Sequence, residues 1–343
     1  MKSKREVIIQ VLNHQQPPYV PWSIGFTMEA SEKLKNHLQS DDLDTAINNH
    51  IVYLSNAWNY YIDVGDGLVQ DHFGVVWDRS VDKDIGIVHG VTLSSPTLKG
   101  YSFPDPCDPY IFSTIEQKIK LYSDCFRVFD ISFSSFERAW TLRGMENLFM
   151  DMMDNPDFVT DLFNTIADYN IAQIQEALKY DIDAVYFGDD WGQQHGLQMG
   201  PKLWKKFIYP TIKRMYKTVK DAGKFVFIHS CGDVDELFPD LVEIGVDCFN
   251  PFQPEVMDVH ALIQHYRGKL TFHGGLSTQK TLPYGTVEDV HKETLKLLES
   301  GEKGNYIFSP AHAVEGDVSL ENMVAFIEIM NNQLQYNRRR ISY

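Results

Sequence analysis

The chain has 343 residues, of which 43% are hydrophobic and 23% are charged, and its formal net charge at pH 7 is −16. This is the composition of a globular protein with enough apolar residues for a large core. We find no run of about 18 apolar residues, so we predict no membrane span. A nucleic-acid-binding surface needs clustered lysine and arginine, so the acidic balance argues against a nucleic-acid partner and favours solubility.

The N-terminus and the cysteines bear on where the protein resides. The first five residues are basic, but Glu6, Asn13 and His14 interrupt the apolar core that a signal peptide needs. Four cysteines in so long a chain do not suggest a disulfide scaffold. We therefore expect a cytoplasmic protein with reduced thiols.

The N-terminal half has an irregular pattern. Residues 20–24 and 127–131 have the apolar composition of strands. Six glycines between residues 65 and 100 predict hairpins and loops. A helical stripe of apolar residues then covers 157–179. We expect the early part of the fold to carry these hairpins as additions to a regular core.

The C-terminal half alternates between short apolar runs and amphipathic segments. The predicted strands are 184–188, 225–228, 246–249, 270–272 and 305–308. The predicted helices are 201–221, a short one capped by Asp233 or Asp235 and running to Glu243, 256–266, 287–298 and 320–331. Five β/α units in succession predict an α/β protein, a (β/α)₈ TIM barrel with an elaborated N-terminal half. We expect residues 1–343 to form a single domain.

Polar side chains end all five of these strands. They are Asp189 and Asp190, His229 and Cys231, Asn250, His273, and Ser309 and His312. In a parallel barrel the carboxyl ends of the strands share one face, and that face holds the active site. Packing alone does not explain so regular a placement.

The pair His229 and Cys231 is the strongest candidate. Zn²⁺ accepts nitrogen and sulfur ligands, and two such residues at a strand end reach one ion together. His312 is the candidate third ligand, which leaves a fourth position for substrate, as in catalytic zinc sites. The alternatives are a buried histidine with a structural cysteine, and a structural zinc site, for which we find no fourth ligand.

Asp189 and Asp190 form a second cluster. Adjacent carboxylates at a strand end are not both easily ionised, so one is a candidate acid or base, and Asp190 could also orient a metal ligand. We favour Asp190 over Asp189. The alternative is a helix-capping aspartate beside a solvated one.

Further residues are candidates for shaping a pocket on this face. His273 is a candidate catalytic residue, and the two glycines that follow it would let a ligand approach the backbone. Trp22, Trp191, Gln193 and Asn250 are the candidate substrate-binding residues, with core packing as the alternative for each tryptophan. Asp258 and His260 match the start of a corrinoid-binding motif, but the glycine expected three residues later is Ile263, and we predict an ordinary helix there.

Four segments carry a resemblance to a known family. They are residues 138–147, with the sequence RAWTLRGMEN; 188–194, GDDWGQQ; 229–233, HSCGD; and 309–312, SPAH. From Pro18 onward the chain resembles the uroporphyrinogen decarboxylase superfamily, and most closely its corrinoid-dependent methyltransferase branch. The decarboxylases carry an arginine-rich segment near the N-terminus for the carboxylates of a porphyrinogen, and residues 22–27 contain no arginine.

The resemblance implies a barrel with zinc bound by His229, Cys231 and a later residue. That later residue is a cysteine in the methyltransferase branch and corresponds to His312 here. One thiolate and two imidazoles leave Zn²⁺ with a charge of +1, whereas two thiolates leave it neutral, so the zinc site in this chain would be the stronger Lewis acid.

The sequence therefore predicts a zinc-dependent methyltransferase component. It would move a methyl group between a small methylated substrate, such as a methoxylated aromatic, and the corrinoid of a separate protein. The alternative is a zinc-dependent lyase or decarboxylase of the superfamily that acts without corrinoid; a porphyrinogen decarboxylase and a non-catalytic binding protein are weaker readings. We expect no nucleic-acid or membrane partner, and a homodimer remains open.

Overall fold

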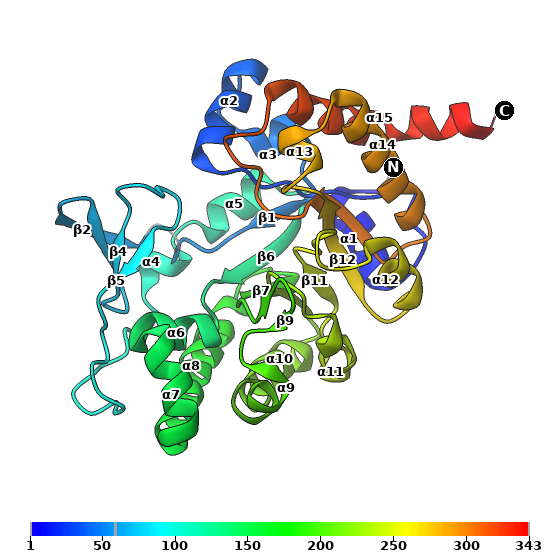
Figure 1. The fold of residues 1–343 in the computed structure, drawn as a ribbon. Coiled ribbons are helices and arrows are strands. Elements are labelled where there is room, and N and C mark those ends of the chain that lie inside the picture. Colours follow the sequence, from blue (N-terminus) through cyan, green and yellow to red (C-terminus); the bar gives the residue numbers. More distant parts are fainter. Residues whose placement is uncertain (1, 58–59, 342–343) are drawn as a thin grey trace. The chain divides into compact units, whose positions relative to one another are not determined.

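Figure 1 draws the fold of this computed structural model, coloured along the sequence. The chain divides into two compact units. The structure describes residues 2–57 and 60–341, with side chains through Gln333. Unit 1 comprises Met1–Val52, Tyr122–Phe126 and Asp247–Tyr343, and unit 2 comprises Tyr53–Leu121 and Arg127–Val246. No helix in the described part of the chain is long and apolar enough to cross a membrane.

The main sheet confirms the predicted α/β class and the (β/α)₈ barrel type. Within the described residues it has seven strands: β1 (Ile51–Tyr53), β6 (Phe126–Ile131), β7 (Ala184–Gly188), β10 (Phe225–His229), β11 (Cys248–Asn250), β12 (Thr271–Leu276) and β13 (Tyr306–Pro310). Five of the seven strands correspond to the five C-terminal runs predicted from sequence, and β6 corresponds to the predicted strand 127–131.

In unit 2, β6, β7 and β10 are neighbouring parallel strands. Asp130 of β6 is aligned with Tyr186 of β7, and Gly188 of β7 with His229 of β10. All six residues of β6 are buried. Burial of both faces explains why the strand sequences are continuously apolar rather than alternating. This register places the ends of β7 and β10, and therefore Asp190 and Cys231, next to each other.

An antiparallel sheet of hairpins precedes these strands in unit 2, as the glycines predicted. It consists of β2 (Tyr61–Gly65), β3 (Leu68–Asp71), β4 (Val76–Asp78) and β5 (Ile87–His89), drawn in blue to cyan in Figure 1. Gly65 and Gly67 have φ angles of +92° and +77° in the β2–β3 turn. Such positive values favour glycine, so the turn positions of the sequence fix this hairpin.

Helices flank the strands of unit 2. They are α4 (Pro109–Phe112), α5 (Ile115–Leu121), α6 (Phe136–Arg143), α7 (Met145–Asp154), α8 (Pro156–Ala177), α9 (Gly200–Leu203), α10 (Tyr209–Asp221) and α11 (Phe238–Glu243). A small hairpin of β8 (Gly192–Gln193) and β9 (Gly196–Leu197) follows β7. Helix α8 matches the apolar stripe predicted over 157–179.

Two helix predictions in unit 2 were wrong in detail. The continuous helix predicted over 201–221 is interrupted by a π-helical segment, Trp204–Ile208, in which the Tyr209 amide bonds to the Trp204 carbonyl. Pro210 lacks an amide hydrogen, so the regular α-helical ladder cannot continue through it. The predicted side-chain cap by Asp233 or Asp235 is also absent, because the segment before α11 begins as a 3₁₀ turn, Asp235–Leu237, that has no side-chain cap.

Unit 1 contains the strand series β11, β12 and β13, in which β12 lies between the other two. The predicted strand over 20–24 forms only a bridge between Trp22 and Phe308 of β13. Its backbone is nevertheless bonded on both sides, since Ser23 donates to Phe308 and His50 donates to Trp22. Pro21 has no amide hydrogen, which limits the length of regular pairing. Residues 20–24 thus occupy the place of the eighth parallel strand of a (β/α)₈ barrel.

The helices of unit 1 are α1 (Lys4–Leu12), α2 (Met28–Leu38), α3 (Leu43–Ala46), α12 (Val259–His265), α13 (Thr281–Tyr284), α14 (Val287–Gly301) and α15 (Leu320–Ile341). Helix α12 begins three residues later than predicted, because the Asp258 side chain accepts a hydrogen bond from the Ala261 amide and caps its N-terminus. This capping role explains Asp258 without a corrinoid, as the sequence suggested.

Candidate functional site

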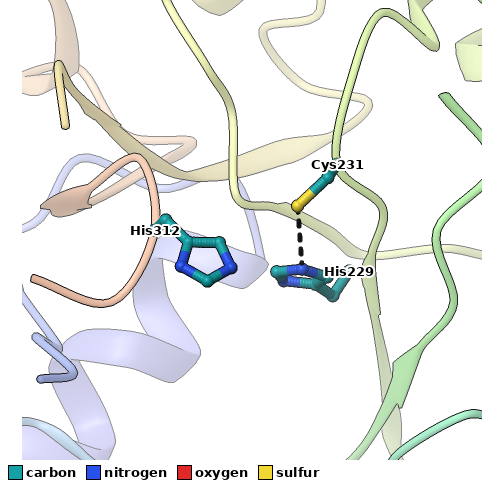
Figure 2. Close-up of side chains that lie close together, drawn as sticks. All are labelled: His229, Cys231 and His312. Carbon is teal, nitrogen blue, oxygen red and sulfur yellow. Dashed lines mark hydrogen bonds between the residues drawn. The ribbon is translucent and has the colours of Figure 1, made fainter. Parts of the chain in front are cut away.

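The end of β10 places His229 and Cys231 together. His229 is the last residue of the strand, and its Nε2 lies 3.4 Å from the Cys231 Sγ (Figure 2). Bond lengths of 2.0–2.3 Å in a tetrahedral zinc site would separate a nitrogen and a sulfur ligand by about 3.5 Å. The pair therefore fits a shared metal ion without rearrangement of either side chain.

Close backbone contact fixes the loop that carries Cys231. The buried Ser230 hydroxyl accepts a hydrogen bond of 2.9 Å from the Trp191 amide. A Cβ on Gly192 would lie 2.6 Å from the Cys231 carbonyl oxygen, and one on Gly232 would lie 2.4 Å from the Gly192 carbonyl carbon. Only glycine at both positions permits this approach. The loop after β7 thus holds the loop after β10.

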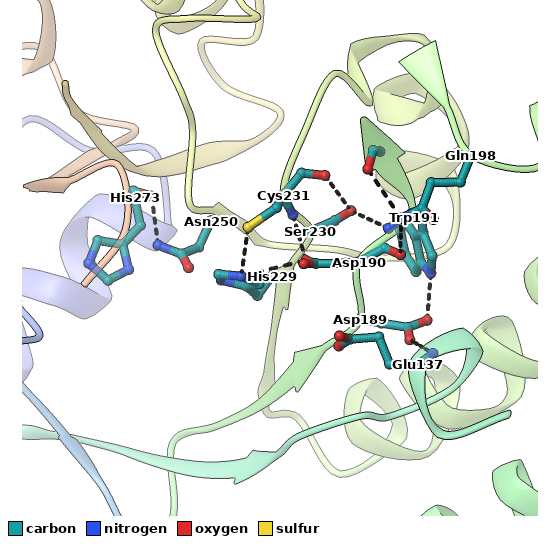
Figure 3. Close-up of polar contacts among 11 residues, drawn as sticks. Glu137, Asp189, Asp190, Trp191, Gln198, His229, Ser230, Cys231, Asn250 and His273 are labelled. Carbon is teal, nitrogen blue, oxygen red and sulfur yellow. Dashed lines mark hydrogen bonds and ion pairs between the residues drawn. The ribbon is translucent and has the colours of Figure 1, made fainter. Parts of the chain in front are cut away.

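Asp190 contacts both members of the pair. Its Oδ1 accepts a hydrogen bond of 2.7 Å from the Cys231 amide and lies 3.7 Å from His229 Nε2 (Figure 3). His229 Nε2 is also the atom that faces Cys231 Sγ, so a metal ion bound between them would lie close to the Asp190 carboxylate. The hydrogen bond to the Cys231 amide holds the backbone of the loop that carries the thiol.

Asp189 has a different environment. It is fully buried and accepts hydrogen bonds from the Phe136 amide at 3.0 Å, the Glu137 amide at 2.7 Å and the Trp191 indole. Burial raises the pKa of Asp189 to about 7, against the lowering effect of these donors. Since Phe136 and Glu137 open α6, Asp189 caps that helix from the end of β7. The capping alternative therefore describes Asp189, and a catalytic role for Asp190 stays a prediction.

Glu137 is a site residue that sequence reasoning missed. It is half-buried beside the two aspartates, and burial, followed by the charges of Asp190 and Asp189, raises its pKa well above the usual range. Burial also raises the pKa of the Cys231 thiol, and Asp190 and Glu137 raise it further. A divalent cation would favour the ionised forms of these acidic groups, so the donor set suits one. The sequence signal that could have identified Glu137 was its position in the first turn of α6, the helix that follows β6.

In unit 1, His273 and Asn250 form a local network. Asn250 Nδ2 donates to the His273 carbonyl oxygen at 2.9 Å, and His273 Nε2 lies 3.0 Å from the Ser23 carbonyl oxygen (Figure 3). A backbone carbonyl only accepts, so this Nε2 carries a hydrogen. The expectation that glycine leaves room for a ligand here was wrong for Gly274, because a Cβ on it would meet the Pro251 carbonyl oxygen at 1.7 Å.

The two candidate tryptophans have the environment of core residues. Trp22 is 4% exposed and its Nε1 donates to the Ile47 carbonyl oxygen at 3.0 Å. Trp191 is fully buried, and its ring centroid lies 5.5 Å from that of Trp204. A substrate-binding role for either residue therefore stays a prediction.

The remaining two candidates follow strands of the main sheet. Gln193 is exposed in β8, and its carbonyl oxygen accepts a bond of 2.8 Å from the Asp233 amide. His312 follows the end of β13 at Pro310, in unit 1. The roles of both residues stay predictions.

The family model described as uroporphyrinogen decarboxylase (URO-D) matches residues 98–333. The chain belongs to the uroporphyrinogen decarboxylase family. The matched region includes His229, Cys231, Asp190 and His312, and of the candidate site residues only Trp22 lies outside it.

Two curated proteins are similar to this family member. A methylated-thiol–coenzyme M methyltransferase of Methanosarcina mazei is 21% identical over 256 residues, which cover 73% of this chain and 65% of that protein. A uroporphyrinogen decarboxylase of Chloroherpeton thalassium is 23% identical over 176 residues, or 49% of this chain and 46% of that protein. The matches thus span less than two thirds of the length of either relative.

One solved structure is similar in fold to nearly the whole chain. A methyltransferase from Methanosarcina mazei superimposes with a TM-score of 0.75 at 13% sequence identity, over 97% of this chain and 100% of that one. At this identity the match shows that the family domain shares its fold with that methyltransferase.

Proposed function

We propose that this chain is a zinc-dependent methyltransferase component. It moves a methyl group between a small methylated substrate and the corrinoid of a separate protein. The observation that carries the proposal is the 3.4 Å separation of His229 Nε2 and Cys231 Sγ at the end of a barrel strand. The similarity to two methyltransferases supports the reaction class.

We further propose that His312 is the third zinc ligand, and Figure 2 draws the three side chains concerned. Zinc bound by two imidazoles and one thiolate supplies a Lewis acid with one open position. Among the other residues, Asp190 holds the Cys231 backbone and places a carboxylate 3.7 Å from His229 Nε2. His273 and Asn250 are proposed to contact substrate from unit 1.

The proposed donor is a methyl ether, such as a methoxylated aromatic, rather than a methylated thiol. The charge of the ligand set supports this choice, because a zinc site with a charge of +1 polarises an ether oxygen more strongly than a neutral one. The proposed acceptor is a corrinoid on another protein. Asp258, the start of the corrinoid-like motif in this chain, caps α12 instead.

The test is methyl transfer from 2-methoxyphenol to reduced free cobalamin. The reaction is monitored by the absorbance change as methylcobalamin forms. We expect turnover with the zinc-loaded protein, and a loss of at least about 100-fold in Cys231→Ser and in His312→Ala, since each removes one ligand. Asp235→Asn, on the exposed loop after Cys231, is the control and should keep full activity. Fast transfer from methylcobalamin to a thiol, with none from the ether, would contradict the proposed direction and donor.

A second candidate is a zinc-dependent lyase or decarboxylase that works without corrinoid. The family match and the decarboxylase relative favour it. Release of carbon dioxide from uroporphyrinogen in the absence of any corrinoid would support this alternative. We expect none, because residues 22–27 carry no arginine to bind the porphyrinogen carboxylates.

A further inference from the structure

Unit 2 contains a cavity of about 40 Å³, which is separate from the metal-ligand pair. Its walls come from the hairpin sheet, the end of β6 and helices α6 and α8. We call it the polar cavity and define it by six of its lining residues: Asp71, His72, Asp130, Phe133, Arg138 and Tyr169. Its volume has room for about three water molecules, or for the polar end of a larger ligand.

A buried ion pair forms one wall of the polar cavity. Arg138 Nη1 lies 2.8 Å from Asp71 Oδ2, and both side chains are at least 94% buried. The guanidinium also lies over the rings of Phe73 and Phe133, at 3.9 and 5.3 Å from their centroids. Asp71 therefore neutralises the charge of Arg138, and the aromatic rings fix its position.

Three buried polar atoms around the polar cavity have no hydrogen-bond partner among the described residues. They are Arg138 Nε, the Tyr169 hydroxyl and His72 Nδ1. Buried polar atoms in folded proteins are nearly always bonded, so three unpaired atoms around one cavity require water or a polar ligand in it. The backbone of Phe133 in the cavity wall is left-handed, with a φ of +53°, and such strain is common at ligand sites.

The charges around the polar cavity select the kind of ligand. Asp130 lies in its wall, and burial raises the pKa of Asp130 to about 6, so its carboxylate is mostly ionised at neutral pH and accepts hydrogen bonds. Burial lowers the pKa of His72 to about 4, so His72 adds no positive charge. With Arg138 neutralised by Asp71, an anionic ligand would be repelled. A neutral hydroxyl would accept from Arg138 and Tyr169 and donate to Asp130.

The position of the polar cavity relates it to the metal-ligand pair within unit 2. Asp130 is aligned with Tyr186 of β7, and the Tyr186 ring centroid lies 6.1 Å from that of His229 on β10. A molecule held by its hydroxyl at the end of β6 would therefore extend along the strand ends toward His229.

We propose that the polar cavity anchors the methyl donor by binding the hydroxyl of a neutral, oxygen-bearing molecule such as a methoxylated phenol. This inference rests on the proposed methyltransferase function for the role of the bound molecule. Binding itself does not require zinc or corrinoid, so the two proposals are tested apart.

The test is calorimetric titration of 2-methoxyphenol into the full chain, with zinc and after chelation. We expect Tyr169→Phe to weaken binding by about 10-fold, the usual effect of one lost hydrogen bond. The matched control is Tyr216→Phe. Tyr216 on α10 is also buried with an unpartnered hydroxyl, but it packs on Phe187 outside the polar cavity. Removal of the Tyr216 hydroxyl should leave the affinity for 2-methoxyphenol unchanged.

A second probe tests the charge argument. We expect the anion 2-methoxybenzoate to bind at least about 10-fold more weakly than 2-methoxyphenol, because two carboxylates oppose it. Equal affinity in wild type and Tyr169→Phe, tighter binding of the benzoate, or no binding of 2-methoxyphenol would each overturn the inference. Any of these results would leave the zinc proposal standing, whereas binding without cobalamin methylation would contradict only the proposed function.

Discussion

Asp190 shows how one side chain joins the two metal-ligand candidates. Its single Oδ1 bonds to the Cys231 amide and faces His229 Nε2. Asp190→Asn keeps the shape and removes a negative charge beside the proposed zinc position. We expect zinc affinity to fall by about 10- to 100-fold, measured by competition with a chromophoric chelator.

The control for Asp190→Asn is Asp235→Asn, which removes an exposed charge four residues after Cys231. Its zinc affinity should equal that of the wild type. Equal affinity in Asp190→Asn as well would show that Asp190 does not support the metal ligands.

Asp130 predicts a pH dependence of stability. Its pKa is raised by burial to about 6 in the folded state from an ordinary value of 3.8, so the folded protein binds its proton more tightly than the unfolded chain does. The contribution of Asp130 to the free energy of unfolding is therefore greatest below about pH 4 and declines by about 3 kcal/mol as the pH rises past 6.

Urea unfolding of wild type and Asp130→Asn between pH 4 and 8 measures this effect. The asparagine keeps an acceptor for the Ser55 amide, which bonds to Asp130 Oδ1 at 3.1 Å. The stability of the variant relative to wild type should increase with pH across this range. A constant difference would mean that Asp130 titrates normally.

The residues of the site differ in how far sequence could identify them. His229, Cys231 and Asp190 were singled out because each lies at or just after the end of a strand, and strand ends meet on one face of a barrel. Glu137 lies 52 residues before Asp189 and meets it only because Asp189 caps α6. No local pattern encodes that contact, so it required the structure.

At the scale of elements, the β8–β9 hairpin supports the Cys231 loop. Gly192 has no unusual φ, so its requirement for glycine comes from contact alone: an added Cβ would lie 2.6 Å from the Cys231 carbonyl oxygen. Gly192→Ala should therefore destabilise the fold by roughly 1–3 kcal/mol and shift Cys231. Titration with cobalt, monitored by the sulfur-to-cobalt charge-transfer band, should show that Gly192→Ala binds the metal more weakly than wild type.

Gly188→Ala is the matched control for Gly192→Ala. A Cβ on Gly188, at the end of β7, would meet its nearest atom at an ordinary 3.6 Å. Cobalt binding by this variant should equal that of wild type. Equal effects of the two substitutions would show that the hairpin contact does not position Cys231.

The elements show where sequence patterns succeed and where they fail. Apolar runs predicted β6, β7 and β10 closely, because buried parallel strands have a strong compositional signal. The helix over 201–221 was predicted as continuous, and Pro210 instead forces the π-helical segment Trp204–Ile208. Local backbone chemistry there outweighs the helical periodicity on which the prediction depended.

At the scale of the whole molecule, the identity of the third ligand would set the charge of the proposed zinc site. His312→Cys would replace an imidazole with a thiolate and make the site neutral. We expect this variant to keep zinc but to transfer methyl groups from 2-methoxyphenol at least about 10-fold more slowly, measured by methylcobalamin formation. A rate equal to or above that of wild type would contradict the proposed role of His312.

The central claim is that His229, Cys231 and His312 hold one zinc ion, and metal analysis of the purified protein tests it most directly. Elemental analysis should find about one zinc per chain in the wild type and in Asp235→Asn. His229→Ala, Cys231→Ser and His312→Ala should each lose most of it, with circular dichroism confirming that the variants fold. A folded wild-type protein that binds no zinc when it is supplied, or three variants that retain it fully, would contradict the account.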